Sequence, residues 1–157
     1  MKSILFLSLL SMSAAACPEL QGNYRNCTKA LSLERLPGIK ISQARTRGAA
    51  TYEMITEDPY TGVEHREVIH TDGQYREMDE GSDSDIKYKI AYHCENERLH
   101  YDQRVEQDQD GETVQIGIEG SLRKLGGKLV MEKSGSVVLD EAGRISVKSD
   151  PQVIICE

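Results

Sequence analysis

The stretch that decides the fold class is Ile86-Lys87-Tyr88-Lys89-Ile90-Ala91-Tyr92-His93-Cys94-Glu95. Its even positions hold Ile, Tyr, Ile, Tyr and Cys, and its odd positions hold Lys, Lys, Ala, His and Glu. Successive side chains of a β-strand point to opposite faces, so this alternation predicts a strand with one buried and one solvated face. Such strands are typical of antiparallel sheets that pack one face on a core.

The residues after this stretch predict a hairpin, because Asn96-Glu97 suits a tight turn. A hairpin centred there places three pairs of residues opposite each other: Cys94 with Leu99, Tyr92 with Tyr101, and His93 with His100. The first two pairs belong to the inner face, and the histidine pair belongs to the solvated face.

The rest of the chain continues as short strands separated by polar turns. Further strands are expected over residues 20–27, 39–45, 51–56, 64–70, 74–78, 114–122, 128–133, 144–148 and 151–156. A turn at Asp72-Gly73 is expected to pair residues 64–70 with residues 74–78. No long helical pattern occurs. We therefore predict one all-β domain over residues 17–157, an antiparallel up-and-down meander that closes into a barrel, with a β-sandwich as the alternative.

The first sixteen residues are typical of a secretory signal peptide. Lys2 is their only charged residue, an apolar run covers residues 4–10, and Ala14-Ala15-Ala16 precede Cys17. The apolar run is too short to span a bilayer. We therefore expect residues 1–16 to be removed and the mature protein to be secreted or periplasmic, with no transmembrane segment.

Cys17 has an alternative fate, because small residues before a cysteine also resemble a bacterial lipobox. Cys17 would then carry a lipid and anchor the protein to a membrane. Ala14 stands where lipoboxes prefer a larger aliphatic residue, and lipidation leaves an odd set of three cysteines. Cleavage alone leaves four cysteines and permits two disulfides, which favours secretion over the lipid anchor.

The composition excludes one class of partner and restricts the core. The chain has a formal net charge of −7 at pH 7, which phosphate backbones repel, so no nucleic acid is expected as a partner. There is no Trp, and the single Phe, Phe6, lies in the signal region. We expect a core of Val, Ile, Leu and Tyr that disulfides reinforce.

Four cysteines allow three disulfide pairings. If residues 20–27 form one extended strand, Cys17 and Cys27 lie about 30 Å apart at about 3.3 Å per residue, too far for a disulfide. In a closed antiparallel barrel, the start of the first strand lies beside the end of the last one. This argument predicts the pairs Cys17–Cys156 and Cys27–Cys94.

The opening segment, Leu20-Gln21-Gly22-Asn23-Tyr24, resembles the start of the lipocalin and wider calycin barrel, where the family has Gly-x-Trp. The resemblance implies that Tyr24 takes the place of the Trp at the barrel floor, with Arg144 as a candidate basic partner. It also implies a calycin-like barrel that binds a small, mostly apolar ligand. The C-terminal helix of lipocalins is missing, which indicates a reduced relative. Gly22 and Tyr24 also fit a plain strand that fills a core.

Six inner-face residues form the candidate ligand-lining surface: Tyr88, Tyr92, Tyr101, Gln103, Ile116 and Ile118. Buried Tyr hydroxyls and Gln amides need partners, since an unpaired buried polar group costs about 1–3 kcal/mol. A cavity with water or a polar ligand group meets that need. A small filled core whose hydroxyls reach its rim meets it as well, and both alternatives stay open.

His93 and His100 are a candidate pair for a metal ion or for pH sensing, since imidazoles on adjacent strands can share Zn²⁺ or Cu²⁺. A tight site needs three or four ligands, so two solvated surface histidines are the alternative. The chain has neither a Gly-x-Ser-x-Gly elbow nor a phosphate-binding Gly loop. We therefore predict no catalytic residue and no cofactor.

These observations predict a secreted or periplasmic, non-enzymatic binding protein for a small apolar or amphipathic ligand. The alternative is an envelope or secreted protein-interaction module, such as an inhibitor or an assembly factor, with a filled core. A solvent-reachable cavity favours the first function, and a filled interior with an exposed apolar patch favours the second.

Overall fold

The computed structural model describes residues 17–32, 35–46, 49–58, 60–78, 86–109, 112–139, 145–149 and 151–157. The expected signal peptide and Arg144 lie outside the described residues. Throughout the described ranges the regular elements are β-strands, which confirms the all-β prediction. A search of the same ranges finds no helix with the length and apolar character that crossing a membrane requires.

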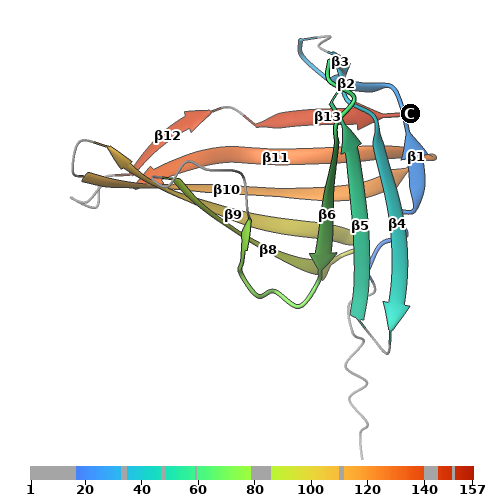
Figure 1. Ribbon diagram of the computed structural model, residues 1–157, viewed down its shortest axis with the longest axis horizontal. Coiled ribbons are helices and arrows are strands. Elements are labelled where there is room, and N and C mark those ends of the chain that lie inside the picture. Colours follow the sequence, from blue (N-terminus) through green and yellow to red (C-terminus); the bar gives the residue numbers. More distant parts are fainter. Residues whose placement is uncertain are drawn as a thin grey trace, which may run out of the picture.

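The described chain forms thirteen strands in two antiparallel sheets (Figure 1). The strands are β1 (Gly22–Tyr24), β2 (Cys27–Lys29), β3 (Arg35–Leu36), β4 (Ile39–Thr46), β5 (Ala49–Glu57), β6 (Glu64–His70), β7 (Arg76–Met78), β8 (Ile86–Glu95), β9 (Arg98–Gln109), β10 (Glu112–Leu125), β11 (Lys128–Leu139), β12 (Ile145–Ser149) and β13 (Gln152–Cys156). The small sheet has the order β1-β4-β5-β6. The large sheet has the order β3-β2-β13-β11-β10-β9-β8-β7, and β12 also pairs with β11.

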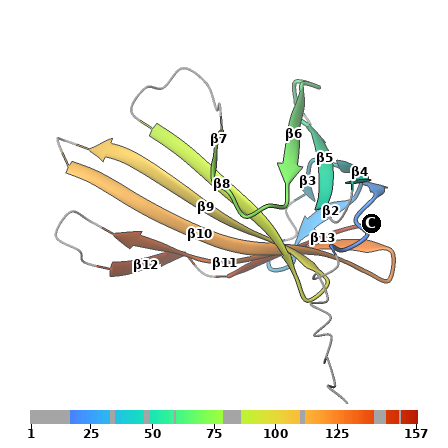
Figure 2. The ribbon, with the colours of Figure 1, turned by 90° about the horizontal axis from the view of Figure 1, so that it is seen from below.

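The two sheets share one core. Figure 2 shows the small sheet standing over one end of the large sheet, while strands β8 to β11 continue well past it. Buried side chains from both sides form a single cluster, which includes Leu20, Tyr24, Ile39, Ile41, Tyr52 and Ile69 with Ile90, Tyr92, Leu99, Leu122 and Leu129. Among the described strands no ladder joins β6 to β7, which are the last strands of the two sheets.

The β8–β9 hairpin has the register expected from the sequence. The three cross-strand pairs are confirmed: Cys94 with Leu99, Tyr92 with Tyr101, and His93 with His100. Asn96 and Glu97 have positive φ angles of 49° and 58°, the left-handed pair that a two-residue hairpin turn needs. Tyr92 is buried and His93 is exposed, as the alternation predicts, whereas Ala91, on the face expected to be solvated, is also buried.

The expected first strand is wrong, and the disulfide pairing changes with it. Residues 20–27 do not form one strand, because β1 pairs with β4 in the small sheet whereas β2 pairs with β13 in the large sheet. This change of sheet places Cys27, and not Cys17, beside the last strand. The disulfides are therefore Cys17–Cys94 and Cys27–Cys156, and the predicted pairs Cys17–Cys156 and Cys27–Cys94 are wrong.

The expected pairing of residues 64–70 with residues 74–78 is also wrong. β6 pairs with β5 and β7 pairs with β8, so the chain crosses from one sheet to the other between β6 and β7. The turn at Asp72-Gly73 docks on β8 instead of closing a hairpin. The Gly73 amide donates to the Tyr92 carbonyl at 2.9 Å, and Asp72 forms a bridge with His93.

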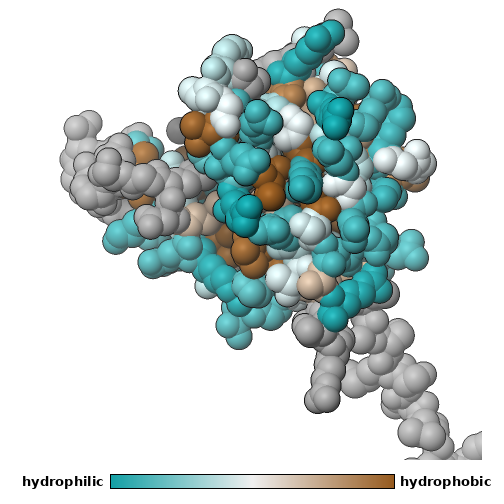
Figure 3. Space-filling model, turned by 45° about the vertical axis from the view of Figure 1, so that its right-hand side comes forward, coloured by the Kyte–Doolittle hydropathy of each residue, from teal (hydrophilic) through white to brown (hydrophobic). Residues whose placement is uncertain are grey.

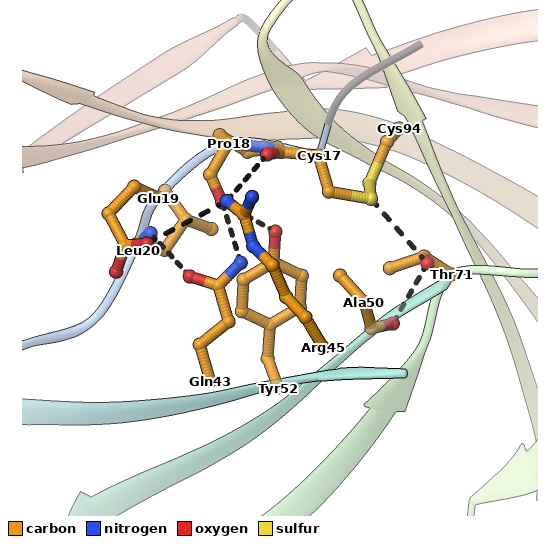
Figure 4. Close-up of a disulfide and its surroundings, with 10 residues drawn as sticks. All are labelled: Cys17, Pro18, Glu19, Leu20, Gln43, Arg45, Ala50, Tyr52, Thr71 and Cys94. Atoms are coloured by element: carbon orange, nitrogen blue, oxygen red, sulfur yellow. Dashed lines mark hydrogen bonds and ion pairs between the residues drawn. A yellow bond between two sulfur atoms is a disulfide. The ribbon is translucent and has the colours of Figure 1, made fainter. Parts of the chain in front are cut away.

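The segment of residues 17–21 joins the two sheets at the core (Figure 4). The Tyr52 hydroxyl donates to the Pro18 carbonyl oxygen at 2.7 Å, and Gln43 Nε2 donates to the same oxygen at 3.1 Å. At the first residue of the segment, the Cys17–Cys94 disulfide connects it to β8. The segment is thus bonded to the small sheet through its backbone and to the large sheet through a covalent bond.

Gly22 and Tyr24 act together in packing the start of the small sheet. Tyr24 is buried, and its hydroxyl donates to the Leu20 carbonyl oxygen at 2.9 Å. A Cβ on Gly22 would lie 2.6 Å from the Tyr24 ring, so a larger residue at this position would displace the ring. The pKa of Tyr24 is raised by burial and by the nearby Glu19 carboxylate, which keeps the hydroxyl a donor.

All four cysteines are paired, which indicates an oxidising, extracytoplasmic environment. The sulfur of Cys17 is bonded to Cys94. A molecule that contains this disulfide therefore has no free thiol at Cys17 to receive a thioether-linked lipid.

Removing either disulfide is expected to lower the free energy of unfolding by about 2–5 kcal/mol, because both close long loops. The sequence separations are 77 residues for Cys17–Cys94 and 129 residues for Cys27–Cys156, so the two losses should be similar. Urea unfolding of the double variants Cys17→Ala with Cys94→Ala and Cys27→Ala with Cys156→Ala measures this. A peptide map of the unreduced protein that links Cys17 to Cys156 would contradict the pairing.

Stability is expected to fall above pH 10 through Tyr52. Burial raises the pKa of Tyr52 to about 12, whereas a Tyr in an unfolded chain ionises near pH 10. The unfolded chain thus loses the proton first, so the contribution of neutral Tyr52 is fully present below pH 10 and is lost between about pH 10 and 12. Urea midpoints at pH 9 and pH 11 should differ less in Tyr52→Phe than in the wild type. Equal differences would contradict this role.

Candidate functional site

A cavity of about 300 Å³ lies between the two sheets. The small sheet contributes Met54 of β5 with Glu67 and Ile69 of β6. The large sheet contributes the remaining lining residues: Met78, Ile90, Tyr92, Tyr101, Gln103, Leu122, Met131, Lys133, Gln152 and Ile154. Aliphatic and thioether side chains predominate, with a few polar groups among them, which is the usual composition of a small-molecule pocket.

The cavity continues into a wider outer cleft of about 680 Å³. Five residues line both spaces, namely Met54, Glu67, Met78, Ile90 and Tyr92. The outer cleft adds charged and polar side chains of the edge strands, including His65 and Arg66 of β6 and Arg76 and Glu77 of β7. Because the described ladders stop at β6 and β7, the cavity opens on this side of the molecule.

Alternating side chains of β8 and β9 form the floor of the cavity. Ile90 pairs with Gln103 and Tyr92 pairs with Tyr101, so these four side chains lie on the same face of the large sheet. The next two strands extend this face, because Leu122 of β10 pairs with Met131 of β11.

Tyr92 and Glu67 form a hydrogen bond across the cavity. The Tyr92 hydroxyl donates to Glu67 Oε1 at 2.6 Å, which connects β8 of the large sheet to β6 of the small sheet. Burial, and after it the neighbouring Glu67 carboxylate, raises the pKa of Tyr92 well above its usual value. At neutral pH Tyr92 is therefore protonated and holds the carboxylate in place.

Tyr101 lies over Gly120 of β10. A Cβ on Gly120 would lie 2.3 Å from Cζ and Oη of Tyr101 and 2.5 Å from the Glu132 carbonyl oxygen. Only a glycine leaves room for the ring, whose hydroxyl end lies over the Gly120 position of β10. Burial also raises the pKa of Tyr101, so this hydroxyl stays a donor at neutral pH.

The structure divides the six predicted lining residues into two groups. Tyr92, Tyr101 and Gln103 line the cavity. Tyr88 and Ile116 each pair with Val105, so they share its face, but they lie farther along the strands and line neither space. Ile118 pairs with Gln103 on the same face and is also absent from both linings. A role in ligand binding stays a prediction for all six residues.

The sequence analysis missed the roof of the cavity and its basic residue. Met54, Glu67 and Ile69 come from the small sheet, and Lys133 comes from β11. Alternation within residues 51–56 marks Met54 as an inner residue, but no local pattern shows which sheet it faces. The position of Lys133 is visible only through its strand pairing with Gly120.

His93 and His100 stack on the solvated face of the large sheet. Their ring centroids are 5.2 Å apart, with an interplanar angle of 15°. In the part of the chain that the structure describes, no group of three or more His, Cys, Asp or Glu residues is placed to hold a metal ion. Arg98 donates to the hydroxyl of Ser121, the cross-strand partner of His100, and its charge is paired with the Glu132 carboxylate.

Gly120→Ala is expected to destabilise the protein by about 1–3 kcal/mol, because the new methyl group clashes with the Tyr101 ring and with backbone. The matched control is Gly117→Ala on the same strand, where a Cβ meets no atom within 4 Å. Thermal unfolding of both variants measures the difference. Similar melting temperatures for the two variants would show that Tyr101 does not lie over Gly120.

No protein-family model matches this sequence, and neither curated proteins nor solved structures yield a similar chain.

Proposed function

We propose that this protein binds a small apolar or amphipathic ligand, without transforming it, in the cavity between its two sheets. The observation that supports this proposal is the cavity itself. Its volume of about 300 Å³ lies at the lower end of the range of small-molecule pockets, about 300–1,000 Å³. The space is open to solvent, and its lining combines apolar side chains with a few polar groups, which is the form of a small-molecule cleft.

The lining supports an adaptable, largely apolar ligand. Met54, Met78 and Met131 contribute three flexible thioether side chains from three strands. Methionine side chains adjust to irregular shapes and are common at surfaces that accept several ligands. The polar outer cleft provides a second environment at the entrance, which suits a ligand with both apolar and polar parts.

The proposed place of action is the periplasm or the exterior of the cell. Two disulfides fit an oxidising compartment, and the first sixteen residues have the pattern of a signal peptide. Secretion without a lipid is favoured over an anchor at Cys17, because the Cys17 thiol is used in the disulfide with Cys94. The mass of the mature protein tests this part of the proposal.

A relationship to calycin barrels is part of the proposal. The up-and-down order of β8 to β11 and the packing of Gly22 with Tyr24 support it. The division into two sheets, with β6 and β7 at their ends, is also what a β-sandwich has. In either case the proposed ligand entrance is the opening of the outer cleft between β6 and β7.

A second candidate function is a protein-interaction module that acts through its turns. Leu31 and Tyr60 lie in two turns and are 93% and 95% exposed, and Val63 is 53% exposed. On the face that Figure 3 shows, hydrophilic side chains interrupt the hydrophobic surface instead of surrounding one broad patch. A partner would then contact small apolar tips on a polar surface, which makes this function the weaker candidate.

Titration with the neutral fluorescent probe N-phenyl-1-naphthylamine tests the binding proposal. The wild type should enhance the fluorescence of the probe in a saturable way. Met54→Trp, which fills the space between the sheets, should weaken binding about tenfold or more. The matched control is Val153→Trp, on β13 outside the cavity, and it should bind like the wild type. Saturable binding that Met54→Trp leaves unchanged would place the site elsewhere.

A further inference from the structure

One end of the cavity carries polar groups without protein partners. Within the described ranges, the Lys133 ammonium, the Tyr101 hydroxyl and the Gln152 side-chain amide make no hydrogen bond or ion pair with the protein. All three residues line the 300 Å³ cavity. All three residues are half-buried, and none of their polar atoms is among the buried, unpartnered side-chain atoms of the described residues, so water reaches these groups in the free protein. They are therefore available to bind a polar ligand atom at the apolar lining.

The strand register brings the three groups into one row. Tyr101 pairs with Gly120, Gly120 pairs with Lys133, and Lys133 pairs with Gln152. Neighbouring strands lie about 4.8 Å apart, and the Tyr101 ring covers the position that Gly120 leaves without a side chain. The Tyr101 hydroxyl therefore lies on the side of its ring nearest Lys133, and Gln152 lies on the other side of Lys133.

The charges of the cavity select the sign of the ligand group. Among the described residues that line the cavity, the charged ones are Lys133 and Glu67, and Glu67 accepts the hydrogen bond of Tyr92. The arginines of the outer cleft are engaged elsewhere, because Arg66 pairs with Glu53 at 3.1 Å and Arg76 pairs with Asp72 at 2.6 Å. Lys133 is therefore the positive charge available inside the cavity.

We infer that the ligand is a long-chain carboxylate, whose head group binds Lys133, Tyr101 and Gln152. This inference rests on the proposed binding function and names its ligand class. One ammonium balances one negative charge, and a hydroxyl and an amide complete the donors for two carboxylate oxygens. The apolar chain of the ligand lies against Met131, Ile90 and Met78 and leaves through the outer cleft.

Three probes of equal chain length test the inference at pH 8: dodecanoate, 1-dodecanol and dodecyltrimethylammonium. Each is measured by displacement of N-phenyl-1-naphthylamine below its micelle concentration. Dodecanoate should bind about tenfold more tightly than dodecanol, and the cation should bind most weakly, since a hydrogen bond to a charged group contributes about that factor. The preference for dodecanoate over dodecanol is the measured quantity.

Lys133→Met should abolish this preference while the variant still binds dodecanol, and Tyr101→Phe should reduce the preference several-fold. The matched control is Lys128→Met, because Lys128 lies on the same strand, outside the cavity, and pairs with Glu157. Unreduced mass and circular dichroism confirm that each variant is folded and has its disulfides.

The outcomes keep the two proposals apart. If the wild type binds dodecanoate and dodecanol equally, or if Lys133→Met keeps the preference, the carboxylate inference is wrong while the binding function stands. If neither probe displaces the dye and the dye itself does not bind, the proposed function fails first. A preference lost in Lys133→Met and kept in Lys128→Met supports the inference.

Discussion

The arrangement of the two sheets depends on the anchoring of residues 17–21. Pro18 and Leu20 of this segment are buried, so their carbonyl oxygens need donors within the protein. The Tyr52 and Gln43 side chains supply donors for Pro18, and the Tyr24 hydroxyl supplies one for Leu20. The Cys17–Cys94 disulfide then ties the same segment to β8. The hydrogen bonds to this segment and its disulfide thus act at the same place, and together they hold the small sheet against the large one.

This anchoring explains why a cavity can persist in a protein with so few large side chains. At the anchored segment, four fully buried side chains fill the core: Leu20 of the segment itself with Tyr52, Leu99 and Leu129. Towards β6 and β7 the hydrogen bond of Tyr92 to Glu67 connects the two sheets, and no strand ladder joins β6 to β7 among the described strands. The interior is therefore packed at one end and open at the other. The methionines and the side chains of Tyr101, Lys133 and Gln152 lie in the open part, which is the proposed binding site.

Prediction from sequence succeeded where neighbours in the chain are also neighbours in space. The alternation of Ile86 to Glu95 identified the side chains that face the core, although Ala91 on the opposite face is buried as well. The short turn at Asn96 and Glu97 fixed the register of the hairpin. Tyr92, Tyr101 and Gln103 were found in the same way, as inner residues of that hairpin. The prediction of the disulfides failed because it treated residues 20–27 as one strand. No local signal marks the change of sheet between Tyr24 and Cys27. This change depends on the pairing of β1 with β4 and of β2 with β13, strands that are distant in the sequence.

Alternation, turn residues and the number of cysteines were enough to predict the all-β class, the main hairpin and the capacity for two disulfides. The tertiary structure alone decided which cysteines pair, which side chains form the roof of the cavity, and that Tyr101, Lys133 and Gln152 stand in one row. These facts depend on contacts between strands that are far apart in the chain. The two-residue period of a strand determines which face of the sheet a side chain occupies. Which residues pack against that face is determined only when the two sheets pack together.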